Sequence, residues 1–346
     1  MKKGDKYGAH RVIRPKGVLP QAADALDNTM EIYDNEILID VETLNIDSAS
    51  FAQIKEQACG EPDKIAEIII ETVHERGKQH NPVTGSGGML MGHVAEIGPG
   101  LRPKCDLNKG DTIISLVSLS LTPLYIEKIL DIKMDKDQVD IIGKAILFER
   151  TVYCKAPHDI PIKLALAVLD VAGAPAQTAK LVKPGDTVLI IGAGGKSGML
   201  CAYEAKKRAG ITGLVIGTGH SPKSTQRAKN TGFCDHVIQI DATNPIELEN
   251  AVANITNNMM ADLTINCVNV PNTEMGSILA TKKNGCIYFF SMATEFTKAA
   301  LGAEGIGSDA RMLIGNGYTN GHAMISLQLL RENTLLFNIL SEMYAA

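Results

Sequence analysis

The stretch that decides the fold is TVLIIGAGGKSGMLCAYEAKKR, residues 187–208. It places a short apolar run before a cluster of glycines, and a helical segment follows the cluster. A nucleoside-triphosphate P-loop needs the pattern G-x-x-x-x-G-K-[ST]. Counted back from Gly195-Lys196-Ser197, the first glycine of that pattern falls on Ile190. We therefore favour a dinucleotide site, in which glycines let the backbone turn tightly and approach a pyrophosphate at a helix N-terminus.

The glycine spacing fits this interpretation imperfectly. In G-x-G-x-x-G the third glycine falls on Ser197, whereas G-x-x-G-x-x-G is matched by Gly192, Gly195 and Gly198. A glycine-rich turn without any ligand is the alternative. The pattern predicts a helix that begins near Met199. The turn residues that we expect at the cofactor are Gly192, Gly194, Gly195, Lys196, Ser197 and Gly198.

Short, continuous apolar runs alternate with helical segments from residue 187 onward. The runs are TVLIIG, GLVIG, HVIQI, DLTINCV and CIYFF. Strands that are buried on both faces look like this, so we infer a parallel sheet with crossover helices. We expect Cys267, Val268 and Ser291, which come at or after the ends of two of these runs, to contribute to the cofactor site.

The end of the second strand bears on the choice between NAD and NADP. An NAD site usually has an acid there that holds the ribose hydroxyls, but no Asp or Glu occurs between Ala205 and Cys234. The absence of an acid permits NADP, so we expect NAD or NADP as the cofactor. A solvated basic helix face is the alternative. The candidate residues are Thr218, Gly219, His220, Ser221, Lys223 and Arg227.

The first half of the chain reads as strands with irregular connections. EILIDVETLNI puts Ile37, Ile39 and Val41 on one face of a strand, with Asp40 and Glu42 on the other. A second strand is expected in GGMLMGHVAEIGPG. Residues 61–77 instead show the spacing of a helix, with a proline in the first turn and a glycine at the end.

Composition excludes several classes of protein. The chain has 346 residues, 45% of them apolar and 21% charged, and a net charge of −5, so we expect neither a nucleic-acid partner nor a membrane surface. The N-terminal residues lack the apolar core of a signal peptide. Seven scattered cysteines without a C-x-x-C pair are typical of reduced thiols. We therefore expect a cytoplasmic protein.

The strand-rich first half, KPGDTVLIIGAGG and RAKNTGFCDHVI together resemble the medium-chain dehydrogenase/reductase superfamily. The resemblance implies an α/β chain in which a chaperonin-10-like β-rich domain is joined to a Rossmann domain with a doubly wound parallel sheet. We expect residues 1–165 and about 316–346 to form the catalytic domain, and residues 166–315 to bind NAD(P).

Two further stretches, MEIYDNEILIDVETLNIDSASF and RGKQHNPVTGSGGMLMG, resemble the L-erythro-3,5-diaminohexanoate dehydrogenase family of lysine fermentation. This resemblance covers essentially the whole chain. It implies oxidative deamination of (3S,5S)-3,5-diaminohexanoate at C3, which gives 5-amino-3-oxohexanoate, ammonia and reduced cofactor. The expected partner is thus a small diamino acid, and we expect a homodimer. A zinc-free quinone or enoyl reductase, or a non-catalytic nucleotide-binding protein, is the alternative.

The chain departs from the zinc-dependent members of the superfamily. They carry a cysteine where this chain has LNIDSAS, and Gly-His-Glu where it has Gly85-Ser86-Gly87. The four-cysteine zinc lobe is also missing, and the segment 61–77 resembles an insertion in its place. His80 and His93 lie nearby in sequence, but two histidines without a third ligand are more often structural. We therefore expect no metal.

Candidate catalytic residues come from the same two positions and from one helix. A dication needs carboxylate partners, and Asp47 leads as ammonium partner or proton acceptor, although a helix cap explains it equally well. Asp170 stands in an otherwise apolar helix, which favours a functional reason. Glu149 is a weaker candidate. The set of expected catalytic residues is Asn45, Asp47, Ser48, Thr84, Ser86 and Asp170.

Overall fold

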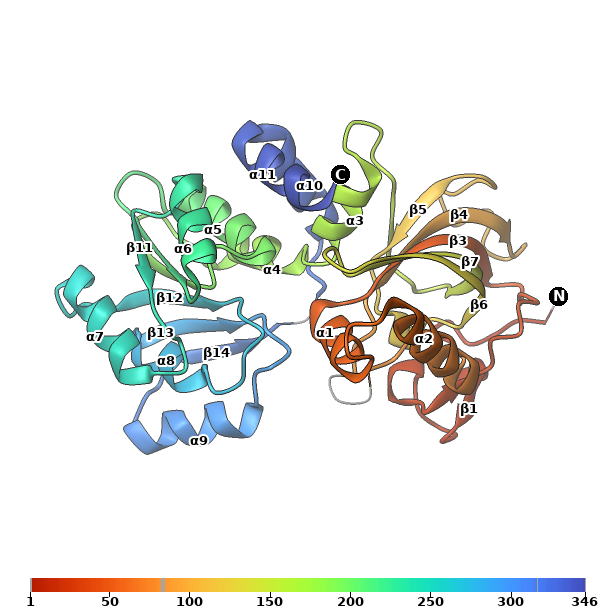
Figure 1. Ribbon diagram of the computed structural model, residues 1–346, viewed down its shortest axis with the longest axis horizontal. Coiled ribbons are helices and arrows are strands. Elements are labelled where there is room, and N and C mark those ends of the chain that lie inside the picture. The colour runs from red at the N-terminus through yellow and green to blue at the C-terminus, as the bar shows by residue number, and fades with distance from the viewer. Residues whose placement is uncertain (1, 82–84, 316, 346) are drawn as a thin grey trace. The chain divides into compact units, whose positions relative to one another are not determined.

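The computed structural model describes residues 2–81, 85–315 and 317–345 (Figure 1). Its chain divides into two compact units, an N-terminal one that ends at Asp170 and a C-terminal one that begins at Val171. Within the described residues, no helix has the length and apolar character needed to cross a membrane.

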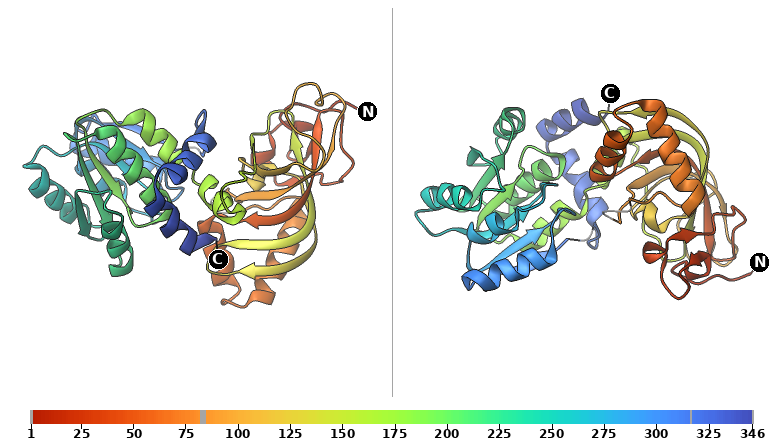
Figure 2. Two further views of the ribbon diagram at one scale, coloured as in Figure 1. Left: turned by 90° about the horizontal axis from the view of Figure 1, so that it is seen from above. Right: turned by 60° about the horizontal axis from the view of Figure 1, so that its bottom comes forward.

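The N-terminal unit is built on a six-stranded antiparallel sheet in the order β6-β7-β3-β4-β5-β8, which is strongly curved (Figure 2). As the alternation of residues predicts, Ile37, Ile39 and Val41 are buried in the core, and Asp40 and Glu42 face outward. The strands are β3 (Glu36–Asn45), β4 (Met89–Ile97), β5 (Thr112–Ser115), β6 (Leu124–Lys133), β7 (Gln138–Phe148) and β8 (Tyr153–Lys155), with a separate pair β1 (Val12–Arg14) and β2 (Ala25–Leu26).

Three helices accompany this sheet: α1 (Ser48–Gln57), α2 (Pro62–Arg76) and α3 (Ile162–Leu169). The predicted helix over residues 61–77 is confirmed as α2, which buries Ile65, Ile69 and Val73 and ends where Gly77 adopts φ 65°. This left-handed conformation suits glycine because it has no Cβ.

A buried ion pair fastens the N-terminal segment to the start of β3. The Arg11 guanidinium donates from Nη2 to Glu36 Oε2 at 2.6 Å and from Nε to Oε1 at 3.0 Å, and both side chains are almost fully buried. Burial alone would raise the pKa of Glu36, but hydrogen bonds from His10 and Arg11 hold that pKa below its usual value. The carboxylate therefore stays charged in the folded protein.

The C-terminal unit contains a six-stranded, wholly parallel sheet in the order β11-β10-β9-β12-β13-β14. This is the doubly wound order of a Rossmann domain, so the predicted fold class is confirmed. The strands are β9 (Thr187–Ile191), β10 (Leu214–Gly219), β11 (His236–Gln239), β12 (Ala261–Asn266), β13 (Thr281–Phe289) and β14 (Arg311–Ile314). The first five match the apolar runs of the sequence. The sequence analysis did not include β14, a short edge strand of half-buried and exposed residues, although its apolar run over residues 312–314 is as long as that of β10.

Helices cover both faces of this sheet, with α4 and α5 on one face and α8 and α9 on the other (Figure 1). The helices are α4 (Gly173–Leu181), α5 (Lys196–Ala209), α6 (Pro222–Thr231), α7 (Pro245–Thr256), α8 (Glu274–Leu279), α9 (Phe296–Ile306), α10 (His322–Glu332) and α11 (Thr334–Tyr344). Strand β9 is buried on both faces, since its residues 188–191 have no exposed surface.

The last two helices belong to the C-terminal unit, whereas the sequence analysis assigned residues 316–346 to the N-terminal domain and placed the boundary at 165. In the structure α10 packs against α4 and α5, and α11 packs against α5. Ser326 Oγ donates to the Ala172 carbonyl at 3.2 Å, and Lys207 Nζ lies 2.5 Å from Glu332 Oε1. The reason is the apolar face of α10, with Leu327, Leu329 and Leu330, which is buried there.

Candidate functional site

The segment from the end of β9 to the first turn of α5 contains three glycines at which a side chain would not fit. A Cβ on Gly192, whose φ is 86°, would lie 2.5 Å from Val268 Cγ1. One on Gly194 would lie 2.0 Å from the Ser224 carbonyl oxygen, and one on Gly198 would lie 2.0 Å from the Gly192 carbonyl oxygen. These glycines let the turn pack closely between α5, α6 and the loop after β12.

Gly195 differs from the other three glycines. A Cβ there would meet only the Gly192 carbonyl oxygen, at 3.4 Å, so the position faces open space. Gly195 is also the N-cap of α5, and no side chain caps the helix. The helix begins at Lys196, three residues before the predicted start, which places Lys196 and Ser197 in its first turn. Open space in front of uncapped N–H groups suits the pyrophosphate of a dinucleotide.

The strand register brings the other predicted cofactor residues to the same edge of the sheet. Ile191 is paired with Thr218 of β10 and with Asn266 of β12, and Asn266 is paired with Phe289 of β13. The segments that follow these four parallel strands therefore leave the sheet side by side, and Cys267, Val268 and Ser291 belong to two of them. The strand order reverses between β9 and β12, which is where doubly wound sheets bind their ligands.

Two side chains of this edge contact the glycine turn directly. The Gly192 N–H donates to Thr218 Oγ1 at 3.3 Å, and Arg227 Nη1 donates to the Gly194 carbonyl at 2.9 Å. His220, Ser221 and Lys223 are exposed beyond the end of β10. Ser221 caps α6 by accepting from Ser224 N at 3.1 Å.

Sequence reasoning missed one buried residue that shapes this edge. Asn266 is fully buried, and its Nδ2 donates to Thr273 Oγ1 at 2.8 Å and to Ser277 Oγ at 3.1 Å. Its Oδ1 accepts from Val268 N at 3.2 Å. Asn266 thereby fixes the loop whose Val268 lies against Gly192. The sequence signal that could have identified Asn266 is a single amide side chain within the apolar run DLTINCV.

In the N-terminal unit, Asp47 is the N-cap of α1. A helix cap was the alternative explanation for this residue in the sequence. Its Oδ1 accepts from Ser50 N at 3.0 Å, and its Oδ2 accepts from Ser50 Oγ at 2.5 Å. Ser48 is exposed and donates to Asp137 Oδ2 at 2.8 Å. The cap accounts for the backbone bond. Asp47 as a residue is half-buried rather than enclosed.

The turn before β4 lies next to this cap. Asn81 Nδ2 donates to Ser50 Oγ at 3.1 Å, and Asn81 N donates to the Ser86 carbonyl at 2.7 Å. The structure thus links the turn after β3, which carries Asp47, to Asn81 and Ser86 ahead of β4. Thr84 lies outside the described residues. Sequence reasoning missed Asn81, because its role depends on a contact across 31 residues.

Asn45, at the end of β3, is buried and accepts from Gln138 Nε2 at 3.2 Å. The same nitrogen donates to the Lys163 carbonyl at 3.4 Å, while Gln138 Oε1 is buried and has no partner among the described residues. The Asn45 side chain is thereby connected to β7 and, through Gln138, to α3. They are those of a structural residue, and they leave its predicted catalytic role without direct support.

The remaining acidic candidates take different positions. Asp170 is the C-cap of α3, and its N–H bonds the Leu166 carbonyl at 3.1 Å. Glu149 accepts from Asn35 Nδ2 at 3.0 Å, and Lys104 Nζ lies 3.8 Å from its other oxygen. Glu149 therefore serves the packing of the N-terminal segment.

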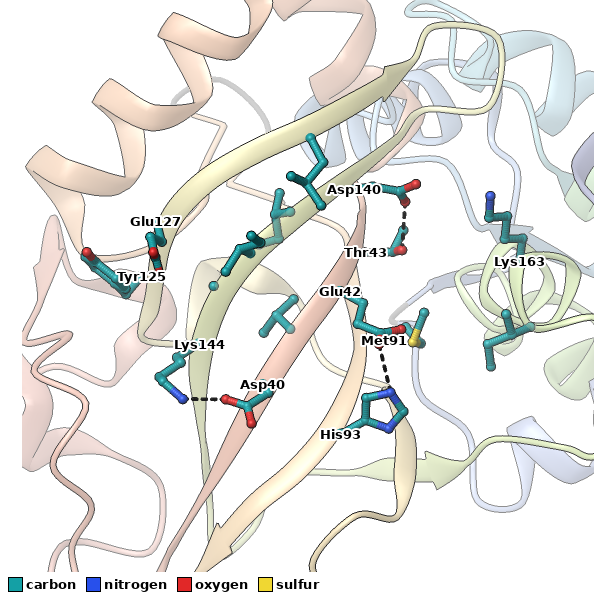
Figure 3. A pocket seen from close by; sticks show the side chains of 16 residues that line it. Asp40, Glu42, Thr43, Met91, His93, Tyr125, Glu127, Asp140, Lys144 and Lys163 are labelled. Atoms are coloured by element: carbon teal, nitrogen blue, oxygen red, sulfur yellow. Dashed lines mark hydrogen bonds and ion pairs between the residues drawn. The ribbon is translucent and has the colours of Figure 1, made fainter.

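A hollow of about 680 Å³ lies on the outer face of the antiparallel sheet and is lined by β3, β4, β6, β7 and α3 (Figure 3). Three of its carboxylates are paired: Asp40 with Lys144, Glu42 with His93 at 2.9 Å, and Asp140 with Lys133. None of the predicted site residues lines this hollow.

The described part of the chain contains no group of three or more His, Cys, Asp or Glu that could hold a metal ion. His93 bonds Glu42 and Thr112, whereas His80 Nδ1 lies 3.4 Å from Arg76 Nη1. The expectation of a metal-free reaction continues to rest on the residue types at the two ligand positions.

Lys78, next to the Asn81 turn, is fully buried, and its Nζ donates to the Pro20 carbonyl at 2.7 Å. Burial, reinforced by the charge of Arg76, lowers the pKa of Lys78 to about 8. A lysine in this state holds η2 (Pro20–Ala22) against the end of α2. Sequence reasoning passed over it because a lysine after a helix normally faces solvent.

Comparison with solved structures bears on the fold. An alcohol dehydrogenase from Thermotoga maritima aligns with a TM-score of 0.56 at 16% identity, over 89% of this chain and 85% of that one. The CurK enoyl reductase aligns with a TM-score of 0.54 at 16% identity, over 89% and 78%. A mycobacterial protein complexed with NADPH gives 0.52 at 15% identity, over 89% and 81%. At such identities the likeness shows the shared fold alone.

Comparison with curated sequences is far closer. Residues 10–157 match the model of the L-erythro-3,5-diaminohexanoate dehydrogenase N-terminal domain. An L-erythro-3,5-diaminohexanoate dehydrogenase from Acetoanaerobium sticklandii is 59% identical over 99% of both chains. One from Fusobacterium nucleatum is 57% identical over 99% of this chain and 100% of its own. The chain therefore belongs to the L-erythro-3,5-diaminohexanoate dehydrogenase family.

Proposed function

We propose that this chain oxidatively deaminates L-erythro-3,5-diaminohexanoate at C3, with a nicotinamide cofactor, to give 5-amino-3-oxohexanoate and ammonia. The observation that carries the proposal is 59% identity, over essentially the full length, to a dehydrogenase of that name. The dinucleotide cradle at residues 192–198 supports it independently, because such chemistry needs a hydride acceptor.

The reaction needs little electrophilic help. The C3 ammonium first loses a proton, and the nitrogen lone pair then assists departure of the C3 hydride. A nicotinamide held at the glycine turn of residues 192–198 would supply the hydride acceptor. Water adds to the resulting iminium carbon, and ammonia leaves as the ketone forms. The protein must bind the dication, accept a proton and orient C3. A polarising metal is not required for these steps, because the nitrogen lone pair stabilises the positive charge that develops at C3 as the hydride leaves.

Within this proposal Asp47 pairs with the reacting ammonium or accepts its proton, and Asp170 pairs with an ammonium. Asp47 is suited to the role because both of its oxygens are held by Ser50 and the residue is only half-buried. A carboxylate partner is needed because an ammonium that is buried without one is costly.

A reductive amination assay tests the function. The protein is given 5-amino-3-oxohexanoate, ammonia and either reduced cofactor, and cofactor oxidation is followed by absorbance. We expect turnover that requires ammonia. Ammonia-independent reduction of a quinone or an enoyl thioester, without activity on the amino-oxo acid, would favour the reductase alternative. Cofactor binding without any turnover would favour a non-catalytic protein.

The cofactor cradle gives a first prediction. Gly195→Asp should weaken cofactor binding at least ~10-fold, about 1.4 kcal/mol, because it puts a carboxylate into the open space before the N-terminus of α5. The turn should still fold, since a Cβ at this position meets only one atom at 3.4 Å. Isothermal titration calorimetry with NAD and NADP gives the measurement, and Gly195→Ala is the uncharged control. A folded Gly195→Asp variant with unchanged affinity would show that the pyrophosphate lies elsewhere.

We further propose that NADP is accepted alongside NAD, because the exposed residues after β10 are hydroxyl-bearing or basic rather than acidic. Gly219→Asp, the obvious test, is unsuitable, since a Cβ there would lie 2.8 Å from Thr225 N. Ser221→Asp is the better variant, because aspartate also caps helices well.

We expect Ser221→Asp to weaken NADP binding about 10-fold more than NAD binding, by about 1.4 kcal/mol, because its charge repels a 2′-phosphate. Ser221→Asn, which caps α6 without a charge, is the control. The two dissociation constants are compared for each variant by fluorescence titration. If both cofactors weaken equally, the 2′-position does not lie near Ser221.

A further inference from the structure

One chain of hydrogen bonds ties together the two turns that carry the catalytic candidates. Asp47 Oδ2 accepts from Ser50 Oγ at 2.5 Å, and that oxygen accepts in turn from Asn81 Nδ2 at 3.1 Å. Ser50 and Asn81 are both almost completely buried, whereas Asp47 is only half-buried. Two buried side chains therefore hold the carboxylate of a residue that is itself only half-buried.

Asn81 also closes the second turn through its backbone. Its N–H donates to the Ser86 carbonyl at 2.7 Å, and its own carbonyl accepts from Gly85 N at 2.9 Å. One residue thus bonds the backbone of Gly85 and Ser86 and, through Ser50, restrains the Asp47 carboxylate. A displacement of Asn81 would move both positions together.

We propose that Ser50 and Asn81 are positioning residues for the amine oxidation, holding the Asp47 carboxylate in the orientation that meets the substrate ammonium. This inference rests on the proposed function. A carboxylate has about four lone-pair sites, and Ser50 occupies one on each oxygen. The remaining sites stay available to an ammonium, and the buried hydroxyl prevents the carboxylate from rotating away.

The hydroxyl contact exceeds what a helix cap needs. Capping is complete when Oδ1 accepts from Ser50 N at 3.0 Å. The hydroxyl bond to Oδ2 adds nothing to the cap and only restrains the second oxygen. Ser50→Ala removes the hydroxyl while it keeps the N–H, so it separates positioning from capping.

The experiment is a double-mutant cycle between Ser50→Ala and Asp47→Asn, read by kcat, KM and the pH profile of kcat/KM on diaminohexanoate. We expect Ser50→Ala to lower kcat about 10- to 100-fold, as misplacement of a reacting group does, with cofactor affinity unchanged. In the Asp47→Asn background the same change should lower kcat less than about 3-fold, because there is no carboxylate left to orient. Asn81→Ala reports on the same network from its other end if Ser50→Ala folds poorly.

Asn28→Ala is the matched control, since Asn28 Nδ2 donates one hydrogen bond to the Leu124 carbonyl at 2.7 Å in the same unit. It should lower the melting temperature without changing kcat or the pH profile. Effects of Ser50→Ala and Asp47→Asn that multiply independently, or a Ser50→Ala variant with wild-type kinetics, would overturn the inference and leave the function intact. A wild-type protein that does not oxidise the diamino acid at all would overturn the proposed function, and this inference with it.

Discussion

Replacing Asp47 by asparagine is expected to lower turnover of diaminohexanoate at least ~100-fold if the carboxylate accepts the proton from the substrate ammonium. The amide has nearly the same size but is far less basic. If the carboxylate only pairs with an ammonium, the loss should appear mainly in substrate affinity. Steady-state kinetics across pH separate the two outcomes, and cofactor affinity should stay unchanged in both.

The substitution is informative because it spares the fold. Asparagine caps helices as well as aspartate does, so its Oδ1 can keep the bond to Ser50 N. Asp5→Asn is the matched control, since Asp5 Oδ1 likewise accepts from the backbone of Tyr7 and Ala9. If Asp47→Asn keeps wild-type kinetics and only lowers the melting temperature, Asp47 is a cap and nothing more.

The second large effect concerns stability. Glu36→Gln should lower the free energy of unfolding by about 3–5 kcal/mol, because it leaves the buried Arg11 guanidinium without a countercharge. Equilibrium denaturation in urea measures the change. Glu61→Gln is the control, since Glu61 forms an exposed pair with Lys64, and such pairs contribute only about 0–1 kcal/mol. A loss at Glu36 no larger than that at Glu61 would contradict the assignment.

The same ion pair predicts the sign of a pH dependence. The pKa of Glu36 is lowered in the folded protein, so folding favours the charged form. Its contribution to stability is present above the pKa of the unfolded chain and is lost as the pH falls through the folded pKa. Acid should therefore destabilise the wild type more steeply than Glu36→Gln. Parallel acid-denaturation profiles would argue against this account.

Local patterns were sufficient to predict the Rossmann sheet and the glycine turn at its carboxyl edge. Buried parallel strands appear as apolar runs, and glycines are needed where another backbone comes close, as Gly194 shows against the Ser224 carbonyl. The edge strand β14 was not predicted, although its three apolar residues 312–314 form a run as long as that of β10. The C-terminal helices were assigned to the other domain, because an apolar helix face does not reveal which surface it covers.

The sequence by itself determined the fold class, the family and the glycine turn, since each depends on residues that are close together along the chain. Only the tertiary structure decided that Asp47 is held by Ser50 and Asn81, that Arg227 bonds the Gly194 carbonyl, and that Glu36 is paired with Arg11. The hydrogen bonds from Asn81 to Ser50 and from Arg227 to Gly194 each join residues that are more than 30 positions apart in the sequence. They arise from packing of apolar surfaces, which sets the distances between polar groups without leaving a local pattern at either one.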